Sequence, residues 1–501
     1  MNLASVIDEH PADAVAVISR GKTTTYGTLR EQVAGFRGGL IGLGLRPGDR
    51  LAVVAANNWY FVVSYLAGLS AGLVVVPLNP ASPAPELRHQ LEAVGVRAAV
   101  VGPSARAAFA EIERGAGSVL EHVIDCGTPD SGSRLLLDDV MAAAPVPPVP
   151  RSRDDLAVLL FTSGTAGPPK AAMLTHGNLL SNLEQGRSGA SAGGRPEDVV
   201  LGVLPLFHIF GLNVVLGATL YAGARVVLIE RFDPASAVET ISNRGVTLVA
   251  GPPTMWAAFA NLPDVTPEMF RTVRLAVSGA APLSEVTARL VKERLGLAIA
   301  EGYGLTETAP TVTSSVGLPY RLGSIGRAAP GVQLRIVGDD GEDVVDGDAG
   351  EIWVRGPSVF GGYWNDPDAT VAALTPDGWL RTGDVAMADD EGYIYLVDRI
   401  KDLIIVSGFN VFPAEVEAIL AGHPGIAGAA VLGVPHPHYG QAVKAFVVPT
   451  AGQSIEEDDI INFCRTRLVR YKCPSKIEFV DRLPEGVVGK LVRRELRPIE
   501  G

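Results

Sequence analysis

Cysteine is scarce in this sequence, where Cys126, Cys464 and Cys473 are the three present among 501 residues. Their odd number and wide spacing, without a Cys-x-x-Cys pair or a Cys/His ligand pattern, argue against a disulfide framework and against a zinc site. So little cysteine is typical of proteins in a reducing compartment. We therefore expect a cytoplasmic location.

Basic residues are outnumbered, because 42 Lys and Arg face 55 Asp and Glu, for a formal net charge of −13 at pH 7. Binding to a phosphate backbone needs a basic face, so we expect no nucleic-acid partner. Residues 59–78 and 199–224 lack charge, but glycine or proline interrupts both, which favours buried α/β segments over membrane spans. The first residues, MNLASVIDEHPADA, carry acids where a signal peptide needs a basic start. These features predict no transmembrane segment and leave peripheral membrane contact and oligomerisation open.

Hydrophobic residues make up 47% of the chain, enough for large cores, and 501 residues allow about three units of ordinary domain size. Residues 27–305 alternate helical patterns with runs such as RLAVVA, LAVLLF and VTLVAG, which predicts mainly parallel sheets covered by helices. Residues 321–398 contain GVQLRIV, GEIWVRG, GYWND, GWLRTGD and GYIYLVD, which predict short antiparallel strands in a β-rich subdomain. The expected fold class is therefore α/β, with a large N-terminal domain (1–398) that includes this subdomain and a small α+β C-terminal domain (402–501).

A glycine- and hydroxyl-rich loop, FTSGTAGPPKAAM (161–173), directly follows the apolar run LAVLL. Backbone N–H groups and hydroxyls in such a loop lack strand partners and form a concave donor site suited to a phosphate. An ordinary polar turn has a similar composition. The order of Gly164, Gly167, Lys170 and Ala171 does not match the P-loop pattern, so the loop indicates a different nucleotide-binding architecture.

Two further stretches carry residues suited to a nucleotide. In EGYGLTETAP (301–310), glycines flank Tyr303, so that its ring face can meet a flat ligand such as adenine. Thr306 and Glu307 then offer a hydroxyl and a carboxylate, which suit phosphate and Mg²⁺. In GWLRTGD (378–384), Asp384 ends a tight turn where a carboxylate can accept the hydroxyls of a ribose.

Charged residues gather at the junction of the two predicted domains, where Arg399, Lys401 and Asp402 lie close in sequence. Charge alone fits a solvated linker equally well. The junction is, however, one of five motifs that occur in order: FTSGTAGPPK, EGYGLTET, GWLRTGD, DRIKDLIIVSGFNVFPAEVE and LPEGVVGKLVRREL. With them the chain resembles, over essentially its whole length, the AMP-forming acyl-CoA synthetases, whose superfamily includes peptide-synthetase adenylation domains and firefly-type luciferases. The resemblance implies that the C-terminal domain is mobile about a hinge at Lys401.

The resemblance also implies ATP, coenzyme A and Mg²⁺, together with a set of site residues. The implied ATP and AMP site comprises Thr162, Ser163, Gly164, Thr165, Ala166, Gly167, Lys170, Gly279, Ala280, Ala281, Glu301, Gly302, Tyr303, Gly304, Thr306, Asp384, Arg399 and Lys490. The implied acyl site comprises His208, Phe210, Gly211, Asn213, Val214, Gly217, Gly304 and Leu305. The implied coenzyme A contacts are Ser407, Gly408, Phe409 and Asn410, and the implied magnesium contacts are Thr165 and Glu307. The implied catalytic residues are Lys490 (the adenylation lysine), His208, Thr306, Glu307 and Lys401.

Two loop positions depart from the family pattern, because Ala166 replaces a second threonine and Ala171 replaces a glycine. The missing hydroxyl removes one hydrogen bond to a charged phosphate, which is worth about 1.5–3 kcal/mol, so we expect weaker ATP binding without loss of activity. His208 lies in the apolar run LPLFHIFG and by itself would be read as a satisfied core histidine. The match to the family favours a position near the acyl carboxylate.

The implied reaction has two steps. A carboxylate attacks the α-phosphate of MgATP to give acyl-AMP and pyrophosphate, and the thiol of coenzyme A then attacks the activated carbonyl. Small and apolar residues in FHIFGLNVVLGATLYAG favour a medium- or long-chain fatty acid, although an aryl acid fits the same description. An acyl-AMP ligase that loads a carrier protein also stays open.

Two other readings are disfavoured. An amino-acid-adenylating domain needs an acid to pair with the substrate ammonium, and FHIFGLN has none. A non-catalytic nucleotide or acyl binder is suggested by Ala166, but the retained Glu307 and Lys490 argue against it.

Overall fold

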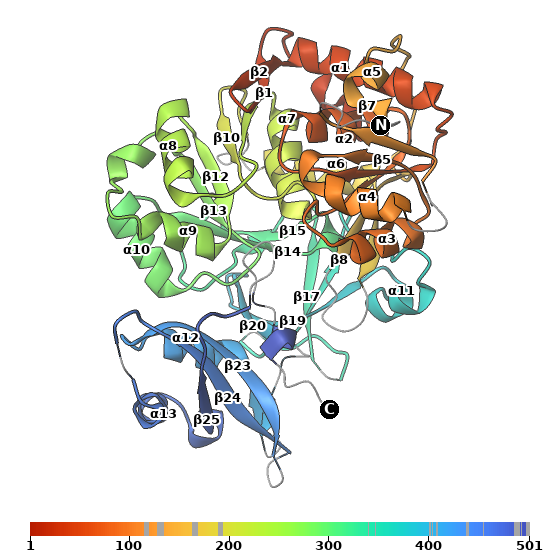
Figure 1. The fold of residues 1–501 in the computed structure, drawn as a ribbon. Helices are drawn as coiled ribbons and strands as arrows, with labels where there is room; N and C mark the ends of the chain where they lie inside the picture. The colour runs from red at the N-terminus through yellow and green to blue at the C-terminus, as the bar shows by residue number, and fades with distance from the viewer. Residues whose placement is uncertain are drawn as a thin grey trace.

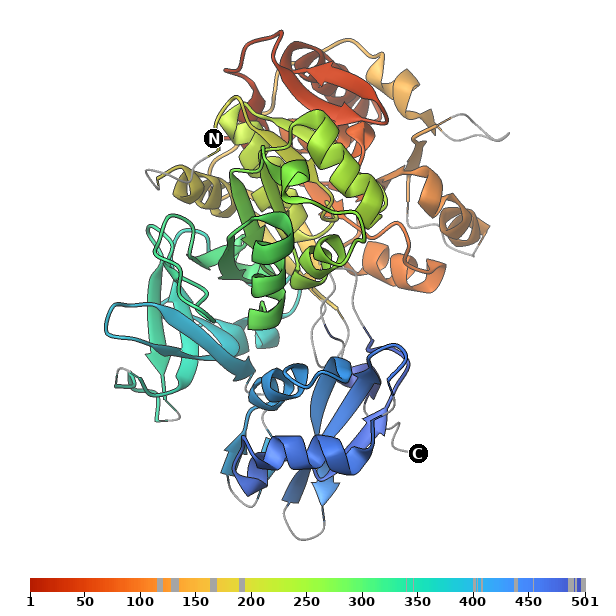
Figure 2. The ribbon, with the colours of Figure 1, turned by 90° about the vertical axis from the view of Figure 1, so that its left-hand side faces the viewer.

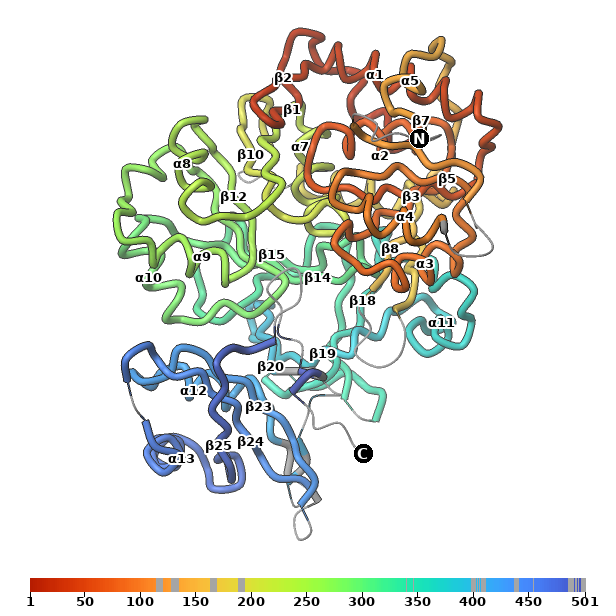
Figure 3. The backbone as a smooth tube through the Cα atoms, viewed as in Figure 1, coloured from red at the N-terminus to blue at the C-terminus, as the bar shows by residue number. Residues whose placement is uncertain are grey.

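A computed structural model of the chain is drawn as a ribbon in Figure 1. It describes residues 1–114, 120–127, 135–162, 169–188, 194–338, 340–345, 347–399, 402, 404–406, 409–436, 440–453, 455–484, 491 and 493–496. Figures 1 and 3 show a large upper body and, below it, a smaller blue lobe formed by residues of the C-terminal part. The lobe remains distinct in the view turned by 90° (Figure 2). The α/β fold class expected from the sequence is confirmed.

Within the described residues, the first sheet has seven strands in the order β7-β6-β5-β3-β4-β8-β9. The strands are β3 (Arg50–Val54), β4 (Val74–Pro77), β5 (Val96–Val101), β6 (His122–Asp125), β7 (Leu135–Leu136), β8 (Leu156–Thr162) and β9 (Lys170–Thr175). Neighbouring strands are parallel except β8 and β9, an antiparallel pair whose ends flank the glycine-rich loop. The helices in this part of the chain are α1 (Tyr26–Gly42), α2 (Trp59–Ser70), α3 (Ala84–Ala93), η2 (Pro103–Ala105), α4 (Arg106–Arg114), α5 (Leu137–Met141) and α6 (His176–Ser188).

The second sheet, again counted over the described residues, has nine strands in the order β16-β15-β14-β13-β12-β10-β11-β1-β2. The strands are β1 (Val15–Ser19), β2 (Lys22–Thr25), β10 (Val199–Gly202), β11 (Arg225–Leu228), β12 (Leu248–Gly251), β13 (Leu275–Ser278), β14 (Ile299–Gly304), β15 (Thr311–Ser314) and β16 (Arg327–Ala328). The strands from β1 to β14 in this order are parallel, and antiparallel strands flank them at both edges. The accompanying helices are η1 (Leu3–Ile7), the π-helix η3 (Phe210–Gly217), α7 (Ala218–Ala222), α8 (Pro234–Arg244), α9 (Pro253–Ala260), η4 (Pro267–Phe270), α10 (Glu285–Leu295) and η5 (Thr306–Thr308). Parallel strands leave a crevice at their carboxyl ends, and the candidate site lies there.

The charge-free stretch 59–78 is the buried helix α2 followed by strand β4, as expected. Helix α2 begins after Asn58, whose side chain accepts a hydrogen bond from the Phe61 N–H, and its residues from Tyr60 to Ser70 are buried. Such a helix is apolar all round because core surrounds it on all sides. Within the described part of the chain, no helix combines the length and apolar character that a membrane span requires.

The β-rich subdomain is an antiparallel sheet in the order β17-β18-β19-β20. Its elements are β17 (Gln333–Val337), β18 (Gly350–Arg355), α11 (Pro367–Ala373), β19 (Leu380–Ala388) and β20 (Ile394–Arg399). The strand predicted for GYWND is wrong, because residues 362–366 form no strand and a single isolated bridge pairs Tyr363 with Ala172. Gly362, at φ +112°, takes a backbone conformation that side chains other than glycine rarely adopt, and Asp366 already caps α11.

The C-terminal lobe is a sheet in the order β22-β21-β24-β23, with β25 paired parallel to β24. Its elements are β21 (Ile404–Val406), β22 (Phe409–Val411), α12 (Pro413–Ala421), β23 (Ile426–His436), β24 (Gly440–Pro449), α13 (Glu457–Arg465), η7 (Arg470–Lys472), β25 (Lys476–Phe479) and η8 (Arg493–Leu496). It packs a core of its own around Val416, Leu420, Val431 and Val447. The predicted domain boundary at 398 lies at the end of β20, the one at 402 lies between β20 and β21, and both stay predictions.

Candidate active site

A continuous cavity of about 2450 Å³ lies between the second sheet, the β-rich subdomain and the C-terminal lobe. The sequence-predicted residues that line it are Thr162, Lys170, His208, Phe210, Asn213, Val214, Gly279, Ala280, Ala281, Glu301, Gly302, Tyr303, Gly304, Leu305, Thr306, Glu307 and Asp384. Seventeen positions scattered over more than two hundred residues of sequence therefore share one cavity. Outside the described residues lie Ser163, Gly164, Thr165, Ala166, Gly167, Lys401, Ser407, Gly408 and Lys490. Arg399 pairs with Asp384 in the β19–β20 ladder, and Phe409 and Asn410 belong to β22.

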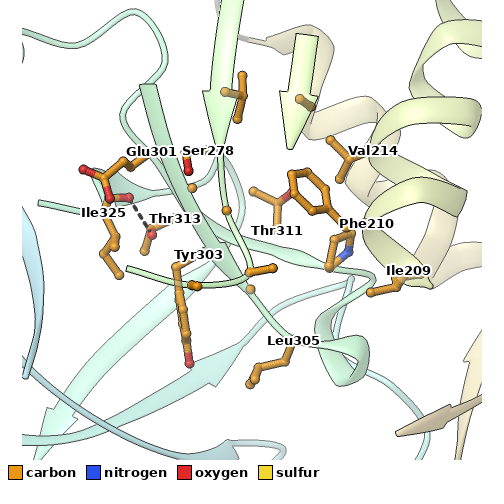
Figure 4. Close-up of a pocket in the computed structure, with 18 of the residues that line it drawn as sticks. Ile209, Phe210, Val214, Ser278, Glu301, Tyr303, Leu305, Thr311, Thr313 and Ile325 are labelled. Carbon is orange, nitrogen blue, oxygen red and sulfur yellow. Dashed lines mark hydrogen bonds between the residues drawn. The ribbon is translucent and has the colours of Figure 1, made fainter. Parts of the chain in front are cut away.

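Tyr303 and Asp384, which are 81 positions apart in sequence, meet in this cavity. The Tyr303 hydroxyl donates a hydrogen bond to Asp384 Oδ2 at 2.7 Å, and the Asp384 side chain is buried in β19. The tight turn predicted before Asp384 is wrong, because residues 380–388 form the single strand β19; Gly383, at φ +72°, lies at a register shift within it, and the Asp384 N–H donates to Thr382 Oγ1 at 3.1 Å. Figure 4 shows the Tyr303 ring extending from β14. A flat ring face beside a buried carboxylate suits the base and the ribose of a nucleoside.

The backbone of Gly279, Ala280 and Ala281, which follows β13, lines the same cavity. A Cβ on Gly279 would lie 3.3 Å from the Gly302 carbonyl oxygen and 3.3 Å from the Phe210 ring, closer than most real Cβ contacts. Ala280 has φ +69°, so the chain turns sharply away after the strand. The absence of a side chain at position 279 lets the Gly302 carbonyl and the Phe210 ring lie close to this backbone.

Two buried polar groups face the cavity behind the slot, at the ends of β13 and β14 (Figure 4). Burial raises the pKa of the Glu301 carboxyl to about 7. The Ser278 hydroxyl is buried and has no hydrogen-bond partner in the described structure. The sequence singled out Glu301 through its motif, whereas Ser278 carried no signal beyond its place before Gly279. Both groups are available to polar atoms of a bound ligand.

The phosphate side of the cavity is built from the β8–β9 hairpin and from η5. Thr162 pairs with Lys170 across the hairpin, so the two ends of the glycine-rich loop lie side by side. The Lys170 ammonium is 3.7 Å from Asp366 Oδ2 and 5.5 Å from the centre of the Tyr363 ring. Glu307 Oε1 accepts a hydrogen bond from the Tyr363 hydroxyl at 2.7 Å.

Oxygen ligands for a magnesium ion are present here in limited number. Thr306 and Glu307 supply a hydroxyl and a carboxylate on η5. Across the described residues, no cluster of three His, Cys, Asp or Glu side chains is arranged to hold a metal ion. Magnesium is commonly held by one or two carboxylates, substrate phosphates and waters, so this donor set fits MgATP better than a resident metal.

The acyl side is lined by the π-helix η3, a rare conformation that is frequent at functional sites. His208 Nδ1 accepts a hydrogen bond from the Phe210 N–H at 3.3 Å, just before this helix. Asn213 anchors it, because its amide donates to the carbonyl oxygens of Leu179 at 3.2 Å and Ala309 at 2.7 Å. Asn213 thus has a structural task as well as a place in the cavity wall.

Gly211 and Gly217 were expected to leave room for the acyl group, but neither is among the residues that line the cavity. A Cβ on Gly211 would lie 2.2 Å from the Pro205 carbonyl oxygen, and one on Gly217 would lie 2.7 Å from Asn213 Oδ1. These glycines allow η3 to pack closely against its own protein. The room for an acyl group comes from elsewhere.

That room is a channel along the inner face of the second sheet. Alternate strand residues line one wall, at Val200 of β10, Leu248 and Ala250 of β12, and Leu275 and Val277 of β13. Residues at helical spacing in η3 and α7 line the other wall: Val214, Ala218, Tyr221 and Ala222. The channel therefore runs the full length of β12 and β13, from the nucleoside slot to the start of the strands.

The far end of the channel holds Asp198, whose charge is already compensated. Arg274 Nε donates to Asp198 Oδ1 at 2.8 Å, and the Thr247 hydroxyl donates to the same oxygen at 2.8 Å. This carboxylate stabilises the start of β10 and is not free to bind a cationic substrate group. The lower side of the cavity is closed by α12 of the C-terminal lobe, where Ala414, Ala418 and Ala421 face it.

A flat nucleoside slot that opens into an apolar channel is the arrangement expected of an enzyme that adenylates an organic acid. Residues 3–364 match the family model described as AMP-binding enzyme, and residues 415–490 match that of the AMP-binding enzyme C-terminal domain. The chain belongs to the AMP-binding enzyme family and is an AMP-forming acid–CoA ligase that uses ATP and coenzyme A.

Relatives of known name cover nearly the whole chain. A feruloyl-CoA synthase from Amycolatopsis sp. is 39% identical over 97% of this chain and 95% of its own. A long-chain-fatty-acid–CoA ligase from Yersinia pestis is 38% identical over 98% of this chain and 92% of its own. The crystal structure of ATP-bound MatB from Rhodopseudomonas palustris superposes with a TM-score of 0.92 at 34% identity, covering 99% of this chain and 98% of that one. The names of these relatives point to different acids.

Proposed function

We propose that the protein joins a medium- or long-chain fatty acid to coenzyme A through an acyl-AMP formed from MgATP. The observation that carries the choice of acid is the channel along β12 and β13. From Ser278 back to Leu275 the wall is one strand long, about 10 Å at roughly 3.3 Å per residue, and it continues to Tyr221 and Ala224. An extended alkyl chain fills such a channel, whereas a single aromatic ring leaves most of it empty.

The apolar walls give a quantitative expectation for chain length. Each methylene transferred from water into an apolar channel contributes about 0.8 kcal/mol, which corresponds to roughly a fourfold gain in affinity. The gain should continue until the chain reaches the polar far end near Asp198. A series of acids therefore measures how much of the channel is used.

The same geometry supports roles for the nucleotide-side residues. Tyr303 and Asp384 would hold the base and ribose, and Lys170, Thr162 and Thr306 would face the phosphates. Glu307 would hold Mg²⁺, which when bound neutralises phosphate charge. No side-chain nucleophile is needed, because the carboxylate of the substrate itself attacks and the barrier is mainly electrostatic.

The carboxylate would enter between His208 and Phe210, at the junction of channel and slot. Lys490 would add positive charge opposite the leaving pyrophosphate when the C-terminal domain is docked for adenylation. Rotation about Lys401 would then present residues 407–410 to coenzyme A.

The deciding experiment measures AMP and thioester formation with saturated acids of six to eighteen carbons, ferulate and benzoate, each with and without coenzyme A. We expect kcat/KM to rise about fourfold for each added methylene until a plateau, and thioester to form only with coenzyme A. A maximum for ferulate would assign the enzyme to aryl acids instead. If acyl-AMP formed without thioester and an added carrier protein became acylated, the carrier protein would replace coenzyme A as the acceptor.

A further inference from the structure

The segment Phe360–Asp366 (FGGYWND) joins two parts of the candidate site, although the sequence suggested only a strand there. Its backbone docks on β9, where Trp364 N–H donates to the Ala171 carbonyl at 2.8 Å and Met173 N–H donates to the Gly362 carbonyl at 2.9 Å. At its start, the Phe360 N–H donates to the Glu307 carbonyl at 2.8 Å. The segment therefore ties the strand that follows the glycine-rich loop to η5, which carries Thr306 and Glu307.

Tyr363 is the side chain through which this segment reaches the cavity. Its hydroxyl donates to Glu307 Oε1 at 2.7 Å, and its ring face lies 5.5 Å from the Lys170 ammonium. The ring itself is held in place, because it packs edge-on against Phe360 at 4.9 Å and its backbone N–H donates to Thr370 Oγ1 at 2.9 Å. One fixed ring thus contacts both an anionic and a cationic group of the phosphate side.

We infer that Tyr363 is a positioning residue for MgATP: its hydroxyl fixes the Glu307 carboxylate, and its ring fixes the Lys170 ammonium. This inference rests on the proposed roles of Glu307 and Lys170. The hydrogen bond occupies one oxygen of Glu307, a residue that itself lines the cavity. The Lys170 ammonium also lies 3.7 Å from Asp366 Oδ2, and the aromatic face of Tyr363 adds a second contact that brings no further negative charge to the lysine.

Two substitutions separate the two contacts. Tyr363→Phe deletes the hydroxyl and keeps the ring, whereas Tyr363→Leu deletes both. Titration calorimetry with ATP, once in excess Mg²⁺ and once in EDTA, measures binding without turnover. We expect Tyr363→Phe to weaken binding about three- to tenfold with Mg²⁺, the size of one ordinary hydrogen bond, and to leave binding in EDTA unchanged. Tyr363→Leu should weaken binding under both conditions.

A matched control is Tyr395→Phe. Tyr395 also donates its hydroxyl to a carboxylate, Asp389 Oδ2 at 3.2 Å, but it belongs to β20 and is not among the residues that line the cavity. The Tyr395→Phe variant should bind ATP with wild-type affinity both in Mg²⁺ and in EDTA. Melting temperatures of Tyr363→Phe and Tyr395→Phe that equal the wild-type value would show that neither loss of a hydroxyl unfolds the protein.

The double variant Tyr363→Phe/Glu307→Gln tests whether Tyr363 acts through Glu307. If it does, the double variant binds MgATP no more weakly than Glu307→Gln alone. The inference would be overturned if the losses of affinity in the double variant were additive. It would also be overturned if Tyr363→Phe bound MgATP as tightly as the wild type or more tightly, or if it lost as much ATP affinity in EDTA as in Mg²⁺. If Glu307→Gln itself left the magnesium dependence unchanged, the proposed role of Glu307 would fail, and that result is distinct from a failure at Tyr363.

Discussion

Glu301 links the stability of the protein to pH through its burial at the end of β14. Burial raises the pKa of its carboxyl from the ordinary 4.5 to about 7. Between these values the folded protein keeps a proton that the unfolded chain has released. The free energy of unfolding therefore falls as pH rises from 4.5 toward 7 and changes no further above that range. Glu301→Gln keeps the shape of the protonated carboxyl at every pH, so this dependence should vanish in the variant.

The size of the effect follows from the pKa difference. At about 1.4 kcal/mol for each pKa unit, moving a carboxyl from 4.5 to about 7 changes the free energy of unfolding by roughly 3 kcal/mol across the interval. As the pH rises from 4.5 to 8, the free energy of unfolding of Glu301→Gln should therefore increase relative to that of the wild type by on the order of 3 kcal/mol. Other titrating groups are the same in both proteins and cancel in the comparison.

Urea unfolding followed by tryptophan fluorescence measures this difference. All five tryptophans of the chain precede residue 380, so the fluorescence reports the N-terminal domain and not the C-terminal lobe. Glu293→Gln, which removes an exposed carboxyl on α10, is the control and should differ from the wild type by a constant amount. A wild-type minus Glu301→Gln difference that stays constant from pH 5 to 8 would show that Glu301 ionises normally in the folded protein.

Two further predictions concern the reaction. Val214→Trp should fill the channel between η3 and the sheet, lowering kcat/KM for long acids at least tenfold while sparing short ones; an unchanged chain-length profile would place the acyl group elsewhere. Lys490→Ala should slow adenylate formation by roughly two to three orders of magnitude, the usual effect of removing one group that stabilises transition-state charge. Thioester formation from acyl-AMP supplied ready-made should be largely spared. Pyrophosphate release measures the first step and a thioester assay measures the second. An equal loss of both steps would contradict a role of Lys490 that is limited to adenylation.

The polar residues of the nucleoside slot were predictable because each lies in a short motif that contains glycine. Tyr303 follows a glycine near the end of β14, Asp384 follows Gly383 in the middle of β19, and the structure brings the two side chains within a hydrogen bond. The crevice at the strand ends of an α/β sheet is where such residues gather, which locates Tyr303, whereas Asp384 lies within an antiparallel strand and only its motif located it. Tyr363 could not be found in this way, because its partner Glu307 is reached through an irregular segment.

The acyl channel was predictable in composition but not in shape. FGLNVVLG is apolar around its whole circumference, and nothing in its composition distinguishes a π-helix from an α-helix. The sequence therefore suggested that Gly211 and Gly217 make space, whereas their small size serves contacts with Pro205 and Asn213. The channel walls come from alternate residues of strands that are neighbours only in the folded sheet, so no local pattern marks them.

The meeting point of acid and nucleotide follows from a contact between two motifs. The Phe210 ring lies against Gly279, where any Cβ would come within 3.3 Å of it. With the acid and the nucleotide placed as proposed above, one ring edge separates the channel from the nucleoside slot, and a carboxylate at the mouth of the channel would lie beside the nucleotide. Holding two reactants side by side replaces an encounter in solution by a reaction within one cavity. This positioning accounts for a large part of the rate acceleration of such an enzyme. A side chain at position 279 would need the Phe210 ring or the Gly302 carbonyl to move by a few tenths of an ångström, so glycine lets these groups lie this close without that shift.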